Sequence, residues 1–259
     1  MVGGGMRPRT ASADTGFPGL SGADLRSVQV DPADPSSVIA WGPDSQWRSA
    51  DGAASWSPIQ AGSTLAGLDP TDPGFVYGLV NGHILHCMLD NTGCSVADSP
   101  SPAHDLYVTP SGRLWSVEDS DLAYSDDHGT TWTSSTDGLP DTLTWGQVTT
   151  LQEAPSDGAT YLSLQPAAQG DPSTLWRRDP QSGDWTQLNE PDTYSAGLVV
   201  SPTDSGVLYA VTPVAVYRSD DGGLSWTTLM GAVHDPVQAS ALTIAPSDPQ
   251  TMYAAIAGA

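Results

Sequence analysis

Residues 217–226 read Tyr-Arg-Ser-Asp-Asp-Gly-Gly-Leu-Ser-Trp, and residues 124–132 read Tyr-Ser-Asp-Asp-His-Gly-Thr-Thr-Trp. Both segments contain the pattern Ser-x-Asp-x-Gly-x-x-Trp, which we call the box. The carboxylate of the box can accept hydrogen bonds from backbone N–H groups of its own turn, and the glycine supplies a positive φ. The tryptophan covers apolar surface beside the turn. The box therefore predicts the turn of a β-hairpin.

Two further segments resemble the box less closely. Residues 47–56 keep its Ser, Asp and Trp but have Ala53 where the other copies have Gly. Residues 176–185 keep only the aromatic ends and a turn-forming middle. A pattern that returns in this way predicts a repeated supersecondary unit. The residues assigned to the box are Ser49, Asp51, Trp56, Ser125, Asp127, Gly129, Trp132, Trp185, Ser219, Asp221, Gly223 and Trp226.

The two cysteines lie where another box is due. Cys87 and Cys94 are seven residues apart, which is also the spacing from Ser to Trp in the box. We interpret this segment as a box whose anchor residues are a cysteine pair, which would clamp the same hairpin as a disulfide. Two free thiols, or a zinc site with His83 and His86, are the alternatives. Strand alternation places His86 on the face opposite Cys87, which argues against zinc, and a disulfide would imply an oxidising compartment.

An apolar strand, a Pro/Asp/Gly turn and a second apolar strand precede each box. These pairs begin near residues 28, 65, 106, 148 and 198, and a sixth pair begins at residue 242 without a box after it. Units of four strands and roughly 40 residues are typical of propeller blades. The sequence thus predicts an all-β protein, a β-propeller of four-stranded antiparallel blades with five complete blades and a partial sixth. The predicted blades cover residues 28–60, 64–97, 104–135, 146–188, 196–230 and 240–259.

The segment 1–27 is expected to be a leader. It can close a six-bladed ring by supplying an outer strand to the last blade, which would cover an exposed sheet edge. If it does not, the chain is a fragment of a propeller.

The composition excludes several classes of partner and enzyme. Acidic residues outnumber basic ones 30 to 8, the net charge is −22, and every basic residue is Arg. Such a surface repels phosphate backbones and anionic lipids, so we expect no nucleic-acid partner. Without Lys there is no P-loop and no Schiff-base lysine. No apolar run approaches the roughly 20 residues that span a bilayer, so membrane insertion is not expected.

The boxes resemble the BNR or Asp-box repeats of sialidases, VPS10 domains of sortilin-type receptors, xyloglucan-cleaving glycosidases and photosystem II assembly factors of the Ycf48 type. The resemblance covers residues 28–229 and implies a propeller. It does not imply one activity, because these families share the box and differ in their active sites.

No catalytic residue can be assigned from the sequence. A sialidase-like site would imply an N-terminal Arg-Ile-Pro motif, which is missing, and Arg48 and Arg218 occupy an ordinary repeat position before a box. The box also lacks the ligand spacing of a calcium loop, so no metal or other cofactor is expected. Trp41 and Trp145 border turns and are the candidate binding platforms.

We therefore expect a non-catalytic, extracytoplasmic or secreted propeller, monomeric, that binds a protein or glycan partner through its loop-rich face. A glycoside hydrolase of the Asp-box class is the alternative, and it predicts two carboxyl groups roughly 5 to 10 Å apart in a concave face. An assembly factor of the Ycf48 type is the third hypothesis, and it predicts a patch of Arg on one blade face.

Overall fold

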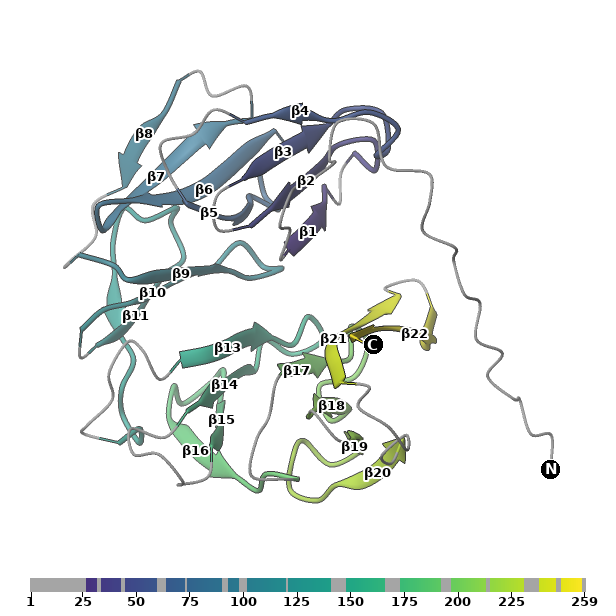
Figure 1. The fold of residues 1–259 in the computed structure, drawn as a ribbon. Coiled ribbons are helices and arrows are strands. Elements are labelled where there is room, and N and C mark those ends of the chain that lie inside the picture. Colours follow the sequence, from purple (N-terminus) through teal and green to yellow (C-terminus); the bar gives the residue numbers. More distant parts are fainter. Residues whose placement is uncertain are drawn as a thin grey trace.

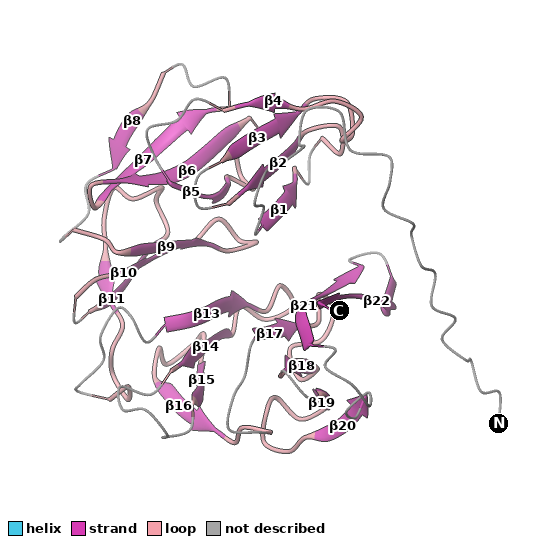
Figure 2. Ribbon diagram, in the orientation of Figure 1, coloured by secondary structure: helices cyan, strands magenta, loops and turns pink. Residues whose placement is uncertain are grey.

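The computed structural model describes residues 27–31, 34–42, 45–59, 64–72, 74–89, 93–97, 102–119, 121–140, 148–165, 173–191, 197–212, 215–230, 238–245 and 248–257. In these ranges the regular structure is entirely β-strand (Figure 1, Figure 2). The strands form five four-stranded antiparallel sheets and one two-stranded sheet. The predicted propeller, with five complete blades and a partial sixth, is confirmed. The closing strand predicted from the leader lies outside the described residues.

Each blade is a meander whose strands pair in chain order. Blade 1 contains β1 (Ser27–Val30), β2 (Val38–Trp41), β3 (Gln46–Ser49) and β4 (Ser57–Pro58). Blade 2 contains β5 (Thr64–Leu68), β6 (Phe75–Val80), β7 (His83–Met88) and β8 (Ser95–Ala97). Blade 3 contains β9 (Asp105–Val108), β10 (Leu114–Val117), β11 (Leu122–Ser125) and β12 (Thr133–Ser134).

Blade 4 contains β13 (Val148–Glu153), β14 (Thr160–Leu164), β15 (Thr174–Arg178) and β16 (Trp185–Leu188). Blade 5 contains β17 (Gly197–Val200), β18 (Leu208–Val211), β19 (Val216–Ser219) and β20 (Thr227–Met230). The two-stranded sheet consists of β21 (Gln238–Ala245) and β22 (Asp248–Ala257), and it lies beside blade 5.

The first strand of each blade is the innermost one (Figure 1). Among these strands β5 lies beside β9, β13 beside β17, and β17 beside β21. Side-chain amides also join inner strands, β1 to β5 and β13 to β17. The Gln29 Oε1 atom accepts a hydrogen bond from Leu68 N at 2.8 Å, and the Gln152 Oε1 atom accepts one from Val200 N at 3.3 Å. The blades are therefore connected at their inner edges by polar as well as apolar contacts.

The core consists of apolar clusters between blades. Each of the four clusters combines side chains of two successive blades, because an isolated four-stranded sheet cannot bury its own faces. Members from the two blades at successive interfaces are Ile39 and Leu65, Tyr77 and Leu106, Trp115 and Leu162, and Tyr161 and Leu208.

The box of blade 5 is held by hydrogen bonds to one carboxylate. Asp221 Oδ1 accepts hydrogen bonds from Ser219 Oγ at 2.7 Å and from Ser225 N at 2.9 Å. Ser219 Oγ in turn accepts one from Gly223 N at 2.8 Å. Trp226 Nε1 donates to Asn189 O of blade 4 at 2.9 Å. The box therefore fixes its own turn and contacts the preceding blade.

The boxes of blades 1 and 3 repeat this arrangement around Asp51 and Asp127. The side-chain and backbone donors of each turn lower the pKa of Asp51, Asp127 and Asp221 to about 2. These carboxylates are ionised at all physiological pH values, and their oxygens are occupied by the turn.

Blades 2 and 4 use other contacts at the same place. In blade 2, Cys87 and Cys94 form a disulfide. In blade 4 the box serine is replaced by Arg178, which is buried and donates from Nε to Ser135 Oγ of blade 3 at 2.9 Å. The Arg178 guanidinium lies over the Tyr124 ring at 4.8 Å, and Trp185 Nε1 donates to Ser135 O at 2.9 Å. The planar guanidinium of Arg178 therefore makes the contact between blades 3 and 4 at this place.

Ala53 provides a test of the box turn. It adopts a φ of +70°, where Gly129 and Gly223 stand in the other boxes with φ of +84° and +92°. A left-handed backbone costs a non-glycine residue about 1–2 kcal/mol. Glycine loses about 0.5–1 kcal/mol more than alanine in conformational entropy on folding. We expect Ala53→Gly to raise the free energy of unfolding by about 0.5–1 kcal/mol, measured by urea denaturation.

Ala54→Gly is the matched control, because Ala54 is the adjacent exposed residue and its φ is not positive. It should lower the free energy of unfolding. Equal effects of the two substitutions would show that the Ala53 backbone is unstrained.

Candidate functional site

The turns and boxes gather at one end of the blades. In blade 5, Gly222 N of the box donates to Gly206 O in the turn between β17 and β18 at 2.8 Å. In blade 1, Gly52 N donates to Ser36 O of the corresponding turn at 2.9 Å. We call this end of the propeller the box face.

One cross-strand pair recurs next to each box. The residue just before the box serine, or before its replacement, pairs with a residue on the second strand of the same blade. Three of these second-strand residues are tyrosine and four of the third-strand residues are Arg or His. The pairs are Ile39–Arg48, Tyr77–His86, Trp115–Tyr124, Tyr161–Arg177 and Tyr209–Arg218.

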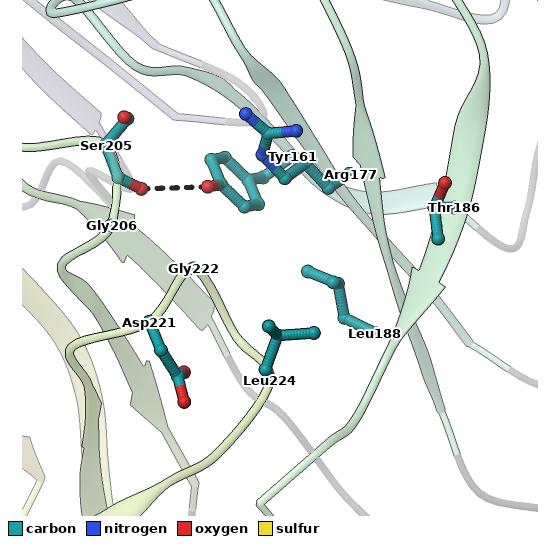
Figure 3. Close-up of a pocket in the computed structure, with 9 residues that line it drawn as sticks. All are labelled: Tyr161, Arg177, Thr186, Leu188, Ser205, Gly206, Asp221, Gly222 and Leu224. Atoms are coloured by element: carbon teal, nitrogen blue, oxygen red, sulfur yellow. Dashed lines mark hydrogen bonds between the residues drawn. The ribbon is translucent and has the colours of Figure 1, made fainter.

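A cavity of about 400 Å³ lies beside such a pair, between blades 4 and 5 (Figure 3). We call it the 4/5 groove. Blade 4 contributes Tyr161, Arg177 and Leu188 to its lining, and blade 5 contributes the box residues Gly222 and Leu224. Figure 3 shows these side chains around one space, with the Tyr161 hydroxyl directed to the turn of blade 5. A volume of this size lies within the roughly 300–1,000 Å³ of small-ligand sites.

The 4/5 groove has one apolar side and one cationic side. Leu188 is buried, whereas Leu224 is 61% exposed. Tyr161 donates from its hydroxyl to Ser205 O at 2.8 Å, and burial raises the pKa of Tyr161. Arg177 is 30% exposed, and its guanidinium lies 3.6 Å from a carboxylate oxygen of Asp157 and 3.7 Å from one of Asp179, both longer than a hydrogen bond. Its guanidinium is therefore only loosely paired and can contact a bound group.

A related cavity of about 450 Å³ lies between blades 1 and 2. Arg48 takes the position of Arg177, and Gly74 takes the position of Gly206. Met88 and Leu89 line it from the loop that the disulfide closes. The same lining positions thus produce cavities at two blade interfaces.

The interface between blades 2 and 3 is filled by a polar cluster. Asp69 Oδ2 accepts a hydrogen bond from the Tyr77 hydroxyl at 2.9 Å and lies 3.1 Å from His86 Nε2. His128 Nδ1, from the box of blade 3, is 2.7 Å from the Tyr77 hydroxyl and 3.2 Å from Asp69 Oδ2. We call these four residues the Asp69 cluster.

Burial and hydrogen bonding set the protonation of the Asp69 cluster. Burial opposes the charge on Asp69, but hydrogen bonds from Thr71 and Tyr77 and the nearby His128 outweigh it and lower the pKa. Burial lowers the pKa of His86, although Asp69 acts in the opposite direction. Burial beside Asp69 also raises the pKa of Tyr77. The cluster is therefore most stable with Asp69 ionised and His86 neutral.

Among the residues that the structure describes, two carboxyl groups have raised pKa values. Burial alone raises the pKa of Glu190 to about 7, and both of its oxygens lack a hydrogen-bond partner. Burial also raises the pKa of Asp105. Asp105 begins the innermost strand of blade 3, whereas Glu190 follows the outermost strand of blade 4. Neither lines the 4/5 groove.

The box residues predicted from the sequence lie at the box face and support the turns there. Trp41 is partly buried against the cluster between blades 1 and 2, and Trp145 lies outside the described residues. Among the residues that the structure describes, no group of three or more His, Cys, Asp or Glu side chains is arranged to hold a metal ion. The described ranges also contain no helix with the length and apolarity needed to cross a membrane.

Sequence reasoning did not find the 4/5 groove or the Asp69 cluster. In the pattern Ser-x-Asp-x-Gly-x-x-Trp, His128 stands at the variable position before Gly129. The missing signal is the recurrence of Tyr on the second strand opposite His or Arg on the third, as in Tyr77–His86 and Tyr161–Arg177. Aligning the blades strand by strand would have shown it.

Comparisons with known proteins agree with the propeller fold. No family model matches the chain. A xyloglucanase of Paenibacillus sp is 26% identical over 175 residues, which is 50% of this chain and 17% of that protein. The structure is similar to a GH74 xyloglucanase from Xanthomonas campestris, with a TM-score of 0.66 and 20% identity over 90% of this chain and 43% of the enzyme.

It is also similar to Ycf48 bound to a D1 peptide, with a TM-score of 0.60 and 17% identity. That match covers 85% of this chain and 72% of Ycf48. The chain thus spans less than a fifth of the Paenibacillus xyloglucanase and less than half of the Xanthomonas enzyme. The likenesses show a β-propeller.

The Asp69 cluster predicts a pH dependence of stability. The pKa of His86 is lower in the folded protein than in the unfolded chain, so the unfolded chain binds more protons below about pH 6.5. Stability from neutral His86 is present above that pH and is lost as the pH falls. We expect the contribution of His86 to the free energy of unfolding to decrease from pH 7.5 to 5.5, by at most about 1.4 kcal/mol per pH unit, whereas the raised pKa of Glu190 acts in the opposite direction.

His86→Gln should reduce this slope in urea denaturation at a series of pH values. His83→Gln is the control, because His83 is an exposed residue of the same strand. A slope that is unchanged in His86→Gln, or reduced equally in both variants, would contradict the assignment.

Proposed function

We propose that this protein is a non-catalytic β-propeller that binds a protein partner at its box face, and that its boxes are Asp-box repeats of the BNR type. The observation that carries the proposal is the 4/5 groove, which combines the exposed Leu224 with the loosely paired Arg177. Arginine is enriched at protein interfaces, and the exposed leucine beside it supplies apolar area that a partner can bury.

The exposed apolar residues favour a protein partner over a glycan. Sugar rings are bound against exposed aromatic faces. In the described part of the chain, none of the large apolar side chains that are exposed is aromatic: they are Val28, Val30, Met88, Val96, Leu224 and Leu229. Aliphatic groups of this kind contribute to binding by burial against another apolar surface.

A glycoside hydrolase is the second candidate, because the sequence match is to a xyloglucanase. Such an enzyme needs one protonated and one ionised carboxyl group facing each other. The box carboxylates have a pKa of about 2 and are occupied by their turns. Glu190 can be protonated near neutral pH, but it lies outside the 4/5 groove. The geometry therefore supports binding better than hydrolysis.

The arginines support a Ycf48-type function less well. In the described residues they are distributed over blades 1, 3, 4 and 5, and Arg113 and Arg218 are paired with Asp126 and Asp220. Separated and paired arginines do not form the single patch that this hypothesis requires. The Cys87–Cys94 disulfide supports an extracytoplasmic or secreted location, because disulfides persist in oxidising compartments.

Peptides selected on the immobilised protein from a random display library test the proposal. We expect Leu224→Ser to weaken the selected peptides roughly 10-fold, since burying a leucine contributes about 1.5–3 kcal/mol. Fluorescence anisotropy measures this loss. Val96→Ser is the matched control, because Val96 is 62% exposed on blade 2 and lies outside the groove.

Equal affinities in all three proteins would refute binding at the groove. Turnover of xyloglucan oligosaccharides by the unaltered protein, abolished by Glu190→Gln, would instead establish the second candidate.

A further inference from the structure

We propose that the 4/5 groove binds one neutral aromatic side chain with a polar edge, of the tyrosine type, from the protein partner. The inference rests on the proposed function and specifies the chemistry of its ligand. It comes from a comparison with the interface between blades 2 and 3, where His128 fills the corresponding space.

The two interfaces are built from equivalent residues. Tyr77 pairs with His86 across β6 and β7, and Tyr161 pairs with Arg177 across β14 and β15. In the next blade, the variable position of the box is His128 in one case and Gly222 in the other. Both take a positive φ, +57° for His128 and +73° for Gly222. The two backbones therefore present this position in the same conformation.

At the first interface the position carries a ring. The His128 Nδ1 atom is 2.7 Å from the Tyr77 hydroxyl, and its ring centroid is 6.0 Å from that of His86 with 29° between the planes. Its side chain is 49% exposed, so the imidazole covers the cluster from the solvent side. The protein itself thus shows that a planar ring with a polar edge fits beside the Tyr–His pair.

At the second interface this position is Gly222, which has no side chain. A Cβ atom on Gly222 would meet only the Tyr161 hydroxyl, at 3.7 Å. The cavity of about 400 Å³ lies beside it. A partner ring in this cavity can hydrogen-bond with Tyr161, as His128 does with Tyr77, while Leu188 and Leu224 pack on its apolar surface.

The charges at the second interface select a neutral ring. Arg177 stands in the place of His86, and a guanidinium attracts the face of a neutral aromatic ring but repels an imidazolium. Ala154 follows β13 at the position where Asp69 follows β5, so that carboxylate is replaced. The acidic groups at this interface have other partners, because Asp157 and Asp179 lie beside Arg177 and the Asp221 carboxylate is bonded within its turn. A phenol meets these conditions, because it stays neutral and its hydroxyl can both donate and accept.

N-acetyltyrosinamide is the probe, and N-acetylleucinamide is the apolar control. We expect the tyrosine probe to shift backbone NMR signals of Gly222 and Leu224 with a dissociation constant on the order of 1 mM, as for an isolated side chain. The leucine probe should bind at least roughly 5-fold more weakly, because it offers neither a ring for Arg177 nor a hydroxyl.

Two substitutions add an imidazole at the 4/5 groove or remove the one between blades 2 and 3. Gly222→His should fill the 4/5 groove from within and weaken the tyrosine probe at least roughly 10-fold. His128→Gly should open a second site, with new shifts at Gly129 and Tyr77, and the double variant should keep only this second site. His128→Gly introduces the residue best suited to a positive φ. This variant therefore tests the inference even if Gly222→His does not fold.

The inference is overturned if the tyrosine probe leaves Gly222 and Leu224 unshifted, if the leucine probe binds as well, or if Gly222→His binds like the unaltered protein. Its failure can be separated from that of the proposed function. If the ring probe does not bind but Leu224→Ser still weakens the selected peptides, the groove binds a partner without an aromatic anchor.

Discussion

Burial of each blade face against the next blade is the constraint on which the whole structure depends. A four-stranded sheet has two faces, and one sheet cannot cover either of them by itself. The four apolar clusters accordingly lie between successive blades, and the inner strands are further tied by the amides of Gln29 and Gln152. Everything at the box face is positioned by this stacking, because each groove takes one wall from each of two blades.

Two chemically different links, a carboxylate and a disulfide, hold the turn after the third strand. Blades 1, 3 and 5 use a carboxylate that accepts hydrogen bonds within its own turn, and blade 2 uses a disulfide. In blade 4 the Asp179 carboxylate accepts hydrogen bonds from Gln181 N and Ser182 N within the turn, and Arg178 connects the blade to Ser135 of the preceding one. The turn is thus a mechanical requirement that several residue types can meet. The same requirement occupies the carboxylates of Asp51, Asp127 and Asp221.

The fold was predictable from the sequence because its signals are local. A box and the two apolar strands before it fall within one unit of roughly 40 residues, so each unit could be recognised alone. The candidate site depends on contacts between units. Asp69 and His128 are 59 residues apart, and Tyr161 and Ser205 are 44 apart. Only the stacking of neighbouring blades brings them together, and within a single box His128 stands at a variable position. Strand alternation did separate His86 from Cys87, which packs between blades 1 and 2.

The variable position of the box, His128 in one blade and Gly222 in another, has a consequence for how such proteins diversify. This residue takes no part in the Ser–Asp bonding that maintains the turn, and its backbone already lies in the left-handed region. A mutation there alters one blade interface and leaves the others intact. Proteins built on this scaffold can therefore differ at one blade interface through one residue while the bonding of the box turns stays the same.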